Sequence, residues 1–170
     1  MGQLVYDRIK YFGEFNLKKT YNAALNWFSE RGFTAHELNY TQKEDEIEIW
    51  IDAERDRNEY IRDTIKLRFH YWSVSPTRND ENGDQLYTGR LLLQVYGILD
   101  VGYEDFYGDN KFNDPKKPWK ANLMKLFEKH ILKRTIEFEY EDVLFYETHN
   151  LINVIKKAYG IEFTTLRGEE

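Results

Sequence analysis

Apolar and polar residues alternate with period two in two neighbouring stretches of the chain, EIEIWIDAE at 46–54 and TIKLRFHYW at 64–72. Successive side chains of a strand point to opposite faces, so each stretch predicts a strand with one apolar face. The second strand is expected to begin at residue 62. A short linker around Asn58 predicts that the two strands form an antiparallel hairpin.

The register of this hairpin follows if paired residue numbers sum to 116. Ile49 then lies opposite Leu67, and a slip of one residue would bury charged side chains. On the polar face the pairing places Glu48 opposite Arg68 and Glu46 opposite His70, which are pairs of opposite charge. It also places Lys66 opposite the ring of Trp50, which is a cation–π pair. These partners neutralise the basic and aromatic stripe made by Lys66, Arg68, His70 and Trp72, which otherwise resembles a nucleic-acid-binding surface.

The N-terminal part of the chain predicts a strand, a helix and a second strand. Residues 3–15 favour a strand that ends at Gly13. Asn16 is a favourable N-cap for a helix with apolar residues at helical spacing, and Gly32 fits the position after its end. Residues 33–43 favour the next strand.

The second half predicts a hairpin tip, a long strand and a helical region. Residues 76–88 are polar and contain Asn-Gly, a strong turn signal, and residues 89–103 form a long apolar strand. Gly97 within that strand suggests a bulge or a bend. Residues 119–159 favour one long kinked helix or two helices, ended by Gly160. One apolar stripe of this region is expected to contain Phe138, Phe145, Ile152, Ile155 and Tyr159.

These elements define an α+β protein with an antiparallel sheet of four to five strands. An N-terminal helix and a long or kinked C-terminal helix pack on the sheet, since each strand has one apolar face to cover. The element order is similar to helix-grip and cystatin-like folds. The length of 170 residues favours a single domain over residues 1–170.

Several short motifs carry a resemblance to other proteins. They are YFGEF at 11–15, the strand entry Tyr60-Ile61, GILDVGYED at 97–105 and ILKR at 131–134. Together they resemble small archaeal α+β proteins of unknown role. The resemblance implies no activity, cofactor or functional residue.

Composition narrows the possible chemistry. The chain has no cysteine, which excludes disulfides, thiolate metal sites and cysteine nucleophiles. Its net charge of −6 disfavours non-specific nucleic-acid binding. It has neither a signal-peptide pattern nor an apolar run long enough to cross a bilayer, so we expect a cytoplasmic protein without membrane contact. Phosphate-binding, serine-nucleophile and zinc-protease motifs are absent, which favours a non-catalytic protein with no cofactor and no metal.

The segment 102–120 is the strongest candidate for a functional surface. It combines acidic residues with rings that have no regular spacing, and Lys111 stands where a calcium loop needs an oxygen ligand. A looser cation site on Asp105 and Asp109 remains an alternative. We expect the segment to bind a partner through its rings, and the candidate interface residues are Tyr103, Phe106, Tyr107 and Phe112.

The sequence therefore supports two possible functions. The first is a non-catalytic interaction or assembly module, whose partner is a protein, either another copy in a homo-oligomer or a different subunit of a larger particle. The alternative is a domain that binds a small apolar ligand in a cavity between helix and sheet. Phe69, Tyr71 and Tyr96 would then line that cavity or fill it.

Overall fold

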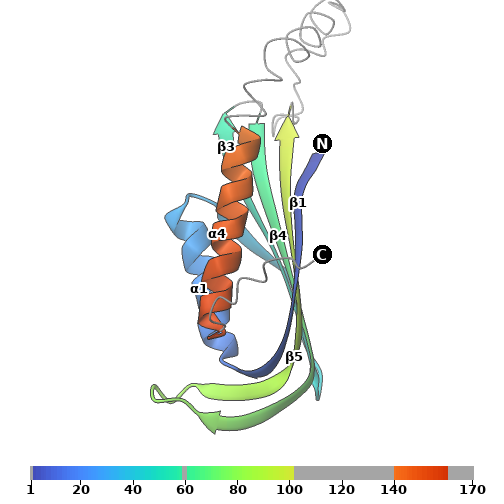
Figure 1. The fold of residues 1–170 in the computed structure, drawn as a ribbon, viewed down its shortest axis with the longest axis vertical. Coiled ribbons are helices and arrows are strands. Elements are labelled where there is room, and N and C mark those ends of the chain that lie inside the picture. The colour runs from blue at the N-terminus through green and yellow to red at the C-terminus, as the bar shows by residue number, and fades with distance from the viewer. Residues whose placement is uncertain (1, 59–60, 102–139, 161–170) are drawn as a thin grey trace, which may run out of the picture.

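The structure is a computed structural model that describes residues 2–58, 61–101 and 140–160 of the chain. Five strands and two helices are described, which confirms the predicted α+β class (Figure 1). In chain order they are β1 (Gly2–Phe15), α1 (Leu17–Glu30), β2 (Thr34–Gln42), β3 (Glu46–Asn58), β4 (Ile61–Asn79), β5 (Gln85–Val101) and α4 (Asp142–Ala158). Of the predicted helical region 119–159, residues 119–139 lie outside the described residues.

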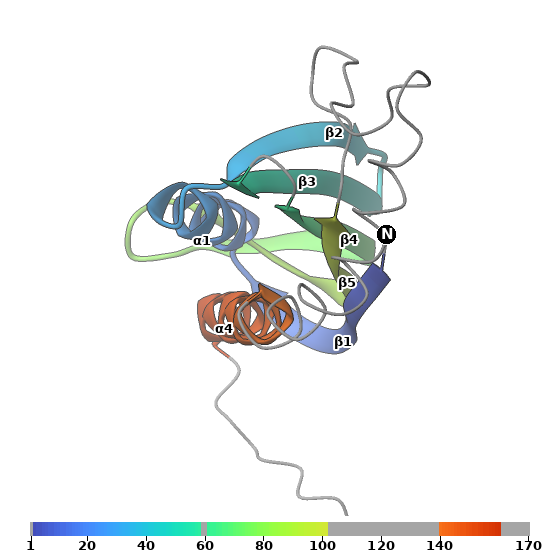
Figure 2. The same cartoon turned by 90° about the horizontal axis from the view of Figure 1, so that it is seen from above.

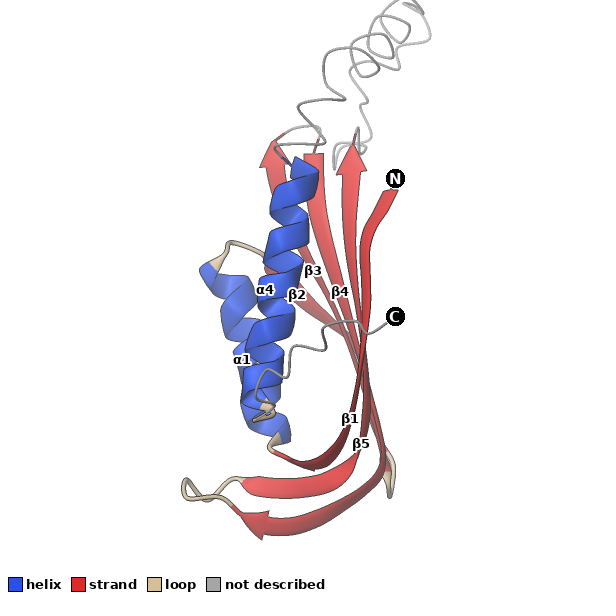
Figure 3. Cartoon of the chain, viewed as in Figure 1, coloured by secondary structure: helices blue, strands red, loops and turns tan. Residues whose placement is uncertain are grey.

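The five strands form one antiparallel sheet in the order β1-β5-β4-β3-β2. Both helices pack against the same face of this sheet, which we call the inner face (Figures 2 and 3). Helix α1 lies over the β2 and β3 side, and α4 lies beside α1 over β5 and β1 (Figure 2). Among the described elements, none covers the opposite, outer face. Neither described helix is long and apolar enough to cross a bilayer.

The alternation of the strands places their apolar residues in the core as predicted. The inner faces of β3, β4 and β5 are almost fully buried beneath apolar side chains of the two helices. The central members of this core are Ile47, Ile49, Ile51, Ile65, Leu67, Phe69, Leu91 and Leu93 from the sheet, with Trp27, Phe28, Leu144 and Leu151 from the helices. Burial of this apolar surface is the main force that holds the helices on the sheet.

The predicted register of the β3–β4 hairpin is wrong by two residues. Ile49 lies opposite Phe69 rather than Leu67. Asn58 pairs with Ile61, and the register shifts between Asp56 and Asn58. Because the error is an even number of residues, every side chain still points to its predicted face.

The polar partners on the outer face change with the register. Trp50 lies opposite Arg68 instead of Lys66, and the Arg68 guanidinium lies 5.4 Å from the centroid of the indole ring. Asp52 pairs with both cations, at 2.6 Å from Arg68 and 3.4 Å from Lys66. Neutralisation of the basic stripe is therefore confirmed. The predicted contact of Glu46 with His70 is present, whereas Arg68 and Lys66 have other partners than those predicted.

A bend across three strands shapes the lower end of the sheet. Strand β1 continues to Phe15 instead of ending at Gly13, because a glycine with φ of 153° lets the strand bend without losing its pairing to Gly89. A Cβ on Gly89 would lie 3.2–3.3 Å from the backbone of β4, where Ser73 has φ of 54° and the register shifts. The bend directs the β4–β5 hairpin beneath the helices (Figure 3).

The helix boundaries follow the predicted capping residues. Asn16 caps α1 by accepting a hydrogen bond from the Lys19 amide, and Gly32 and Gly160 follow the two helices with φ of 72°. The predicted stripe of α4 is wrong at Phe145, whose side chain is exposed. Leu144, one residue before Phe145, fills the core instead, because it lies on the buried side of α4.

Two further residues of β5 differ from expectation in an informative way. Tyr96 does not enter the core but points to the outer face, where its ring lies 5.0 Å from that of Tyr6. Gly97 marks close contact with α4 and β1, since a Cβ there would lie 3.0 Å from Thr148 Oγ1 and 3.2 Å from Val5. The irregularity that Gly97 suggested lies in β1, where the register shifts between Gln3 and Val5.

Candidate functional site

The tip of the β4–β5 hairpin is fastened to the first turn of α1. Asn16, which caps the helix, also donates a hydrogen bond from Nδ2 to Asp80 Oδ2 at 2.9 Å. Lys18 Nζ lies 2.6 Å from Asp84 Oδ1. The turn itself is closed by Asp80, whose Oδ1 accepts the amides of Asn82 and Asp84. These backbone hydrogen bonds, chiefly that of Asp84, hold the pKa of Asp80 below its ordinary value.

A pocket of about 390 Å³ opens between α1, the β2 edge of the sheet and this hairpin. We call it the α1 pocket. It forms because the hairpin curves under the helix instead of continuing straight. Its apolar lining comes from four elements and consists of Leu17 and Tyr21 of α1, Tyr40 of β2, Ile49 of β3 and Tyr87 of β5.

One hydrogen bond joins the helix to the strand across the pocket. The Tyr21 hydroxyl donates to Glu37 Oε2 at 2.6 Å. Burial, followed by this hydrogen bond and the nearby charge of Glu37, raises the pKa of Tyr21 to about 12. The Tyr21 hydroxyl therefore stays protonated at neutral pH, and Glu37 keeps a donor that positions its carboxylate at the pocket.

The other two tyrosines of the pocket are Tyr40 of β2 and Tyr87 of β5. Burial raises the pKa of Tyr40, and the nearby hydroxyl of Tyr87 and carboxylate of Glu37 raise it further. Tyr87 also lies against the core, with its ring centroid 6.2 Å from that of Phe15. Three phenol rings and the Glu37 side chain therefore line the same small space.

The expected interface residues fall elsewhere. Tyr103, Phe106, Tyr107 and Phe112 lie outside the described residues, as does the possible cation site on Asp105 and Asp109. No sequence motif pointed to Glu37, Tyr40 or Tyr87. The surplus of tyrosine, 13 in 170 residues, was the only signal for a tyrosine-lined site.

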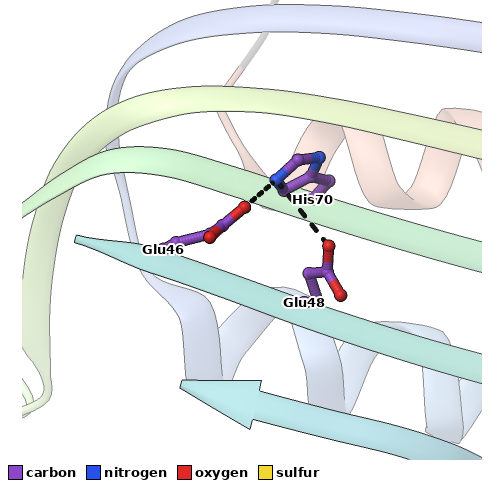
Figure 4. A group of neighbouring side chains, drawn as sticks. All are labelled: Glu46, Glu48 and His70. Atoms are coloured by element: carbon purple, nitrogen blue, oxygen red, sulfur yellow. Dashed lines mark hydrogen bonds and ion pairs between the residues drawn. The ribbon is translucent and has the colours of Figure 1, made fainter. Parts of the chain in front are cut away.

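The outer face carries one group of side chains with suitable spacing for a metal ion. Within the described ranges, Glu46, Glu48 and His70 have ligand atoms within 4.8 Å of one another (Figure 4). His70 Nε2 lies 2.7 Å from Glu46 Oε1 and 3.9 Å from Glu48 Oε1. One imidazole and two carboxylates are ligands that zinc accepts.

The same three residues satisfy one another without an ion. His70 and Glu46 already form a hydrogen bond, and each member of the group is more than one-third exposed. The His70 ring also packs near Trp72, with centroids 5.1 Å apart. We therefore interpret Glu46, Glu48 and His70 as an exposed ion-pair group, called the outer cluster.

A second charged group lies on the inner face and was missed in the sequence. Arg55 and Arg57 contact Asp63 Oδ2 at 2.7 and 2.5 Å, and both also contact Glu147 of α4. Burial opposes the charge of Arg55, but hydrogen bonds to Glu147 and Asp63 raise its pKa overall. We call these four residues the buried cluster. Because it joins β3, β4 and α4, it fastens the C-terminal helix to the sheet.

No protein-family model matches the chain, and no sequence among curated proteins matches it significantly.

Proposed function

We propose that this chain is a small-molecule-binding domain whose ligand occupies the α1 pocket. The observation that carries the proposal is an opening of about 390 Å³, lined by rings and adjoining the buried core at Ile49. Binding pockets for small molecules are concave, mostly apolar and begin at about 300 Å³. The pocket lies between helix and sheet, as the ligand-binding alternative requires.

The rest of the space between helices and sheet supports this location. Phe69 and Tyr71 are buried and their rings are stacked, so they fill the central core instead of lining a cavity. Tyr71 also hydrogen-bonds Tyr159 of the segment that ends α4. A ligand therefore has room beside α1, whereas these two rings fill the core beneath the helices.

Ligand-observed NMR with phenol, benzylamine and benzoate tests the proposal. Leu17→Trp places a larger side chain in the pocket lining, whereas Leu25→Trp makes the same change two turns further along α1 at a half-buried residue outside the lining. We expect at least one compound to bind the wild type and the Leu25→Trp variant but not the Leu17→Trp variant. Absence of binding to the wild type, or equal binding to both folded variants, would contradict the proposal.

A second candidate function is assembly with another copy of the chain through the outer face. Large rings stand exposed on this face, and Phe12 is 72% exposed. Rows of paired residues cross this face from strand to strand. Their side chains are basic on β1 and β5 and acidic on β3. Lys10 shares a row with Glu48, and Arg90 shares a row with Glu46. Lys10 and Arg90 form no ion pair with other described residues.

This polarity favours a second copy as the partner. A two-fold axis parallel to the strands would place the basic side of one sheet over the acidic side of the other, which is a self-complementary interface. The exposed rings would then lie between the charged rows and become buried on association.

Sedimentation velocity tests the assembly proposal directly. We expect twice the chain mass of 20.6 kDa for the wild type and a single chain mass for Lys10→Glu. The charge-exchanged double variant Lys10→Glu with Glu48→Lys should restore the larger species. A wild type that sediments as one chain at all concentrations would exclude this interface.

A further inference from the structure

The charges around the α1 pocket do not balance. Glu37 and Asp84 contribute two negative charges and Lys18 one positive charge, so the lining carries −2 + 1 = −1. The one cation is already engaged, because Lys18 Nζ lies 2.6 Å from Asp84 Oδ1. Glu37 is therefore left with a hydroxyl donor but no cationic partner among the described residues.

The rings of the pocket add to this preference for positive charge. Tyr21, Tyr40 and Tyr87 come from a helix, an edge strand and a central strand, so their rings approach the space from different directions. The face of an aromatic ring is electronegative and attracts a cation, most strongly where water is excluded.

We infer that the α1 pocket binds an organic ammonium cation, held by the three tyrosine rings and the carboxylate of Glu37. This inference rests on the proposed function of the pocket and specifies the class of its ligand. An anionic ligand would be repelled by the net charge of the lining. A neutral ligand would cover Glu37 without replacing the water that hydrates it, which weakens binding.

The placement of Glu37 supports a small cationic head group over a bare metal ion. Its carboxylate accepts a hydrogen bond from the Tyr21 hydroxyl. The rest of the lining consists of phenol rings, apolar side chains such as Leu17, and the polar residues Lys18, Asp84 and Gln85. A hard cation needs about six oxygen ligands, and the second carboxylate of the lining, Asp84, is already paired with Lys18. An alkylammonium group is satisfied by one carboxylate and several ring faces.

Two matched probes test the charge requirement. Choline and 3,3-dimethylbutan-1-ol have the same shape and differ only in a positively charged nitrogen or a neutral carbon. We expect amide chemical-shift titrations of the full chain to give choline a dissociation constant at least roughly tenfold lower than that of the alcohol. The shifted amides should include those of Tyr21, Tyr40 and Tyr87.

Two variants identify the groups responsible. Glu37→Gln retains an acceptor for Tyr21 but removes the charge, and Tyr40→Leu retains apolar bulk but removes a ring face at a half-exposed position on the edge strand. Each should weaken choline binding severalfold and weaken binding of the alcohol clearly less. Thermal unfolding and the amide spectrum of each variant confirm that it is folded.

The outcomes separate this inference from the proposed function. If the alcohol binds as tightly as choline, the preference for a cation is wrong and small-molecule binding stands. If choline fails to bind while phenol or benzoate binds in the pocket, the inference is again overturned alone. If choline and all three aromatic compounds fail, the proposed function is overturned together with it.

Discussion

The β3–β4 hairpin carries one charged cluster on each face, and the two clusters differ in how far their side chains are removed from water. In the buried cluster, Asp63 is 0% exposed and receives both arginines. In the outer cluster, Glu46, Glu48 and His70 are all more than one-third exposed. Both groups are held by the same pair of strands, so the contrast comes from the helix that covers one face and not the other.

Charges must balance on the face of the sheet that the helices cover, whereas on the exposed face water compensates for an imbalance. Arg55 and Arg57 balance Asp63 and Glu147, giving 2 − 2 = 0 beneath α4. A buried charge without a partner loses its hydration and gains nothing in return, so the group must stay balanced. In the outer cluster two carboxylates share one imidazole, because water hydrates whatever remains unpaired.

The largest expected effect follows from unbalancing the buried cluster. Asp63→Ala removes the carboxylate that both arginines contact and leaves an excess positive charge under α4. We expect the free energy of unfolding to fall by about 3–5 kcal/mol, measured by chemical denaturation at neutral pH.

A double-mutant cycle shows whether charge imbalance is the cause. Adding Arg57→Ala to Asp63→Ala restores the balance with Glu147 and Arg55 alone. The double variant should then be more stable than the sum of the two single losses predicts. Strict additivity would mean that Asp63 acts through packing and not through its charge.

A smaller effect is expected from charging a neutral pair on the inner face. The hydroxyls of Tyr71 and Tyr159 are hydrogen-bonded in the core, and burial raises the pKa of both above that of an exposed tyrosine. A group with a raised folded-state pKa stabilises the fold fully below its unfolded pKa of about 10, and this contribution is lost as pH rises further. Between pH 10 and 11 the free energy of unfolding should therefore fall by up to about 1.4 kcal/mol for each tyrosine.

The variant Tyr71→Phe isolates one of the two hydroxyls. Its unfolding free energy should decrease less steeply above pH 10 than that of the wild type, by about 1.4 kcal/mol per pH unit. Below pH 9 the two curves should run parallel, with the variant lower because the Tyr159 hydroxyl has lost a partner. Equal slopes above pH 10 would show that Tyr71 ionises as easily in the folded as in the unfolded chain.

The same hairpin shows how far the sequence predicts the fold. Period-two alternation assigns each residue to a face, and those assignments are correct from Ile47 to Tyr71. The register depends instead on where the turn falls, and the irregularity at Arg57 moves it without changing the face pattern. Only the exact turn geometry distinguishes Leu67 from Phe69 as the partner of Ile49.

The pocket and the buried cluster were harder to predict for different reasons. The pocket assembles residues from Leu17 to Tyr87 and exists only because the sheet bends at Gly13 and Gly89. No local pattern indicates that arrangement. The buried cluster did leave a signal, since Asp63 interrupts the run of apolar residues on the inner face of β4. A charged residue at a core position requires an opposite charge nearby.

The smallest expected effect concerns the outer cluster. His70→Ala removes the shared partner of Glu46 and Glu48, yet both carboxylates remain accessible to water. Exposed ion pairs contribute about 0–1 kcal/mol, and salt screens them. We therefore expect a change in unfolding free energy below about 1 kcal/mol, with Glu48→Gln as the matched control, and a difference that shrinks further at high salt. The contrary result would be a melting temperature that rises by several degrees with added zinc in the wild type but not in His70→Ala. A bound metal contributes its binding free energy to folding, so that outcome would make the outer cluster a metal site instead of an exposed ion-pair group.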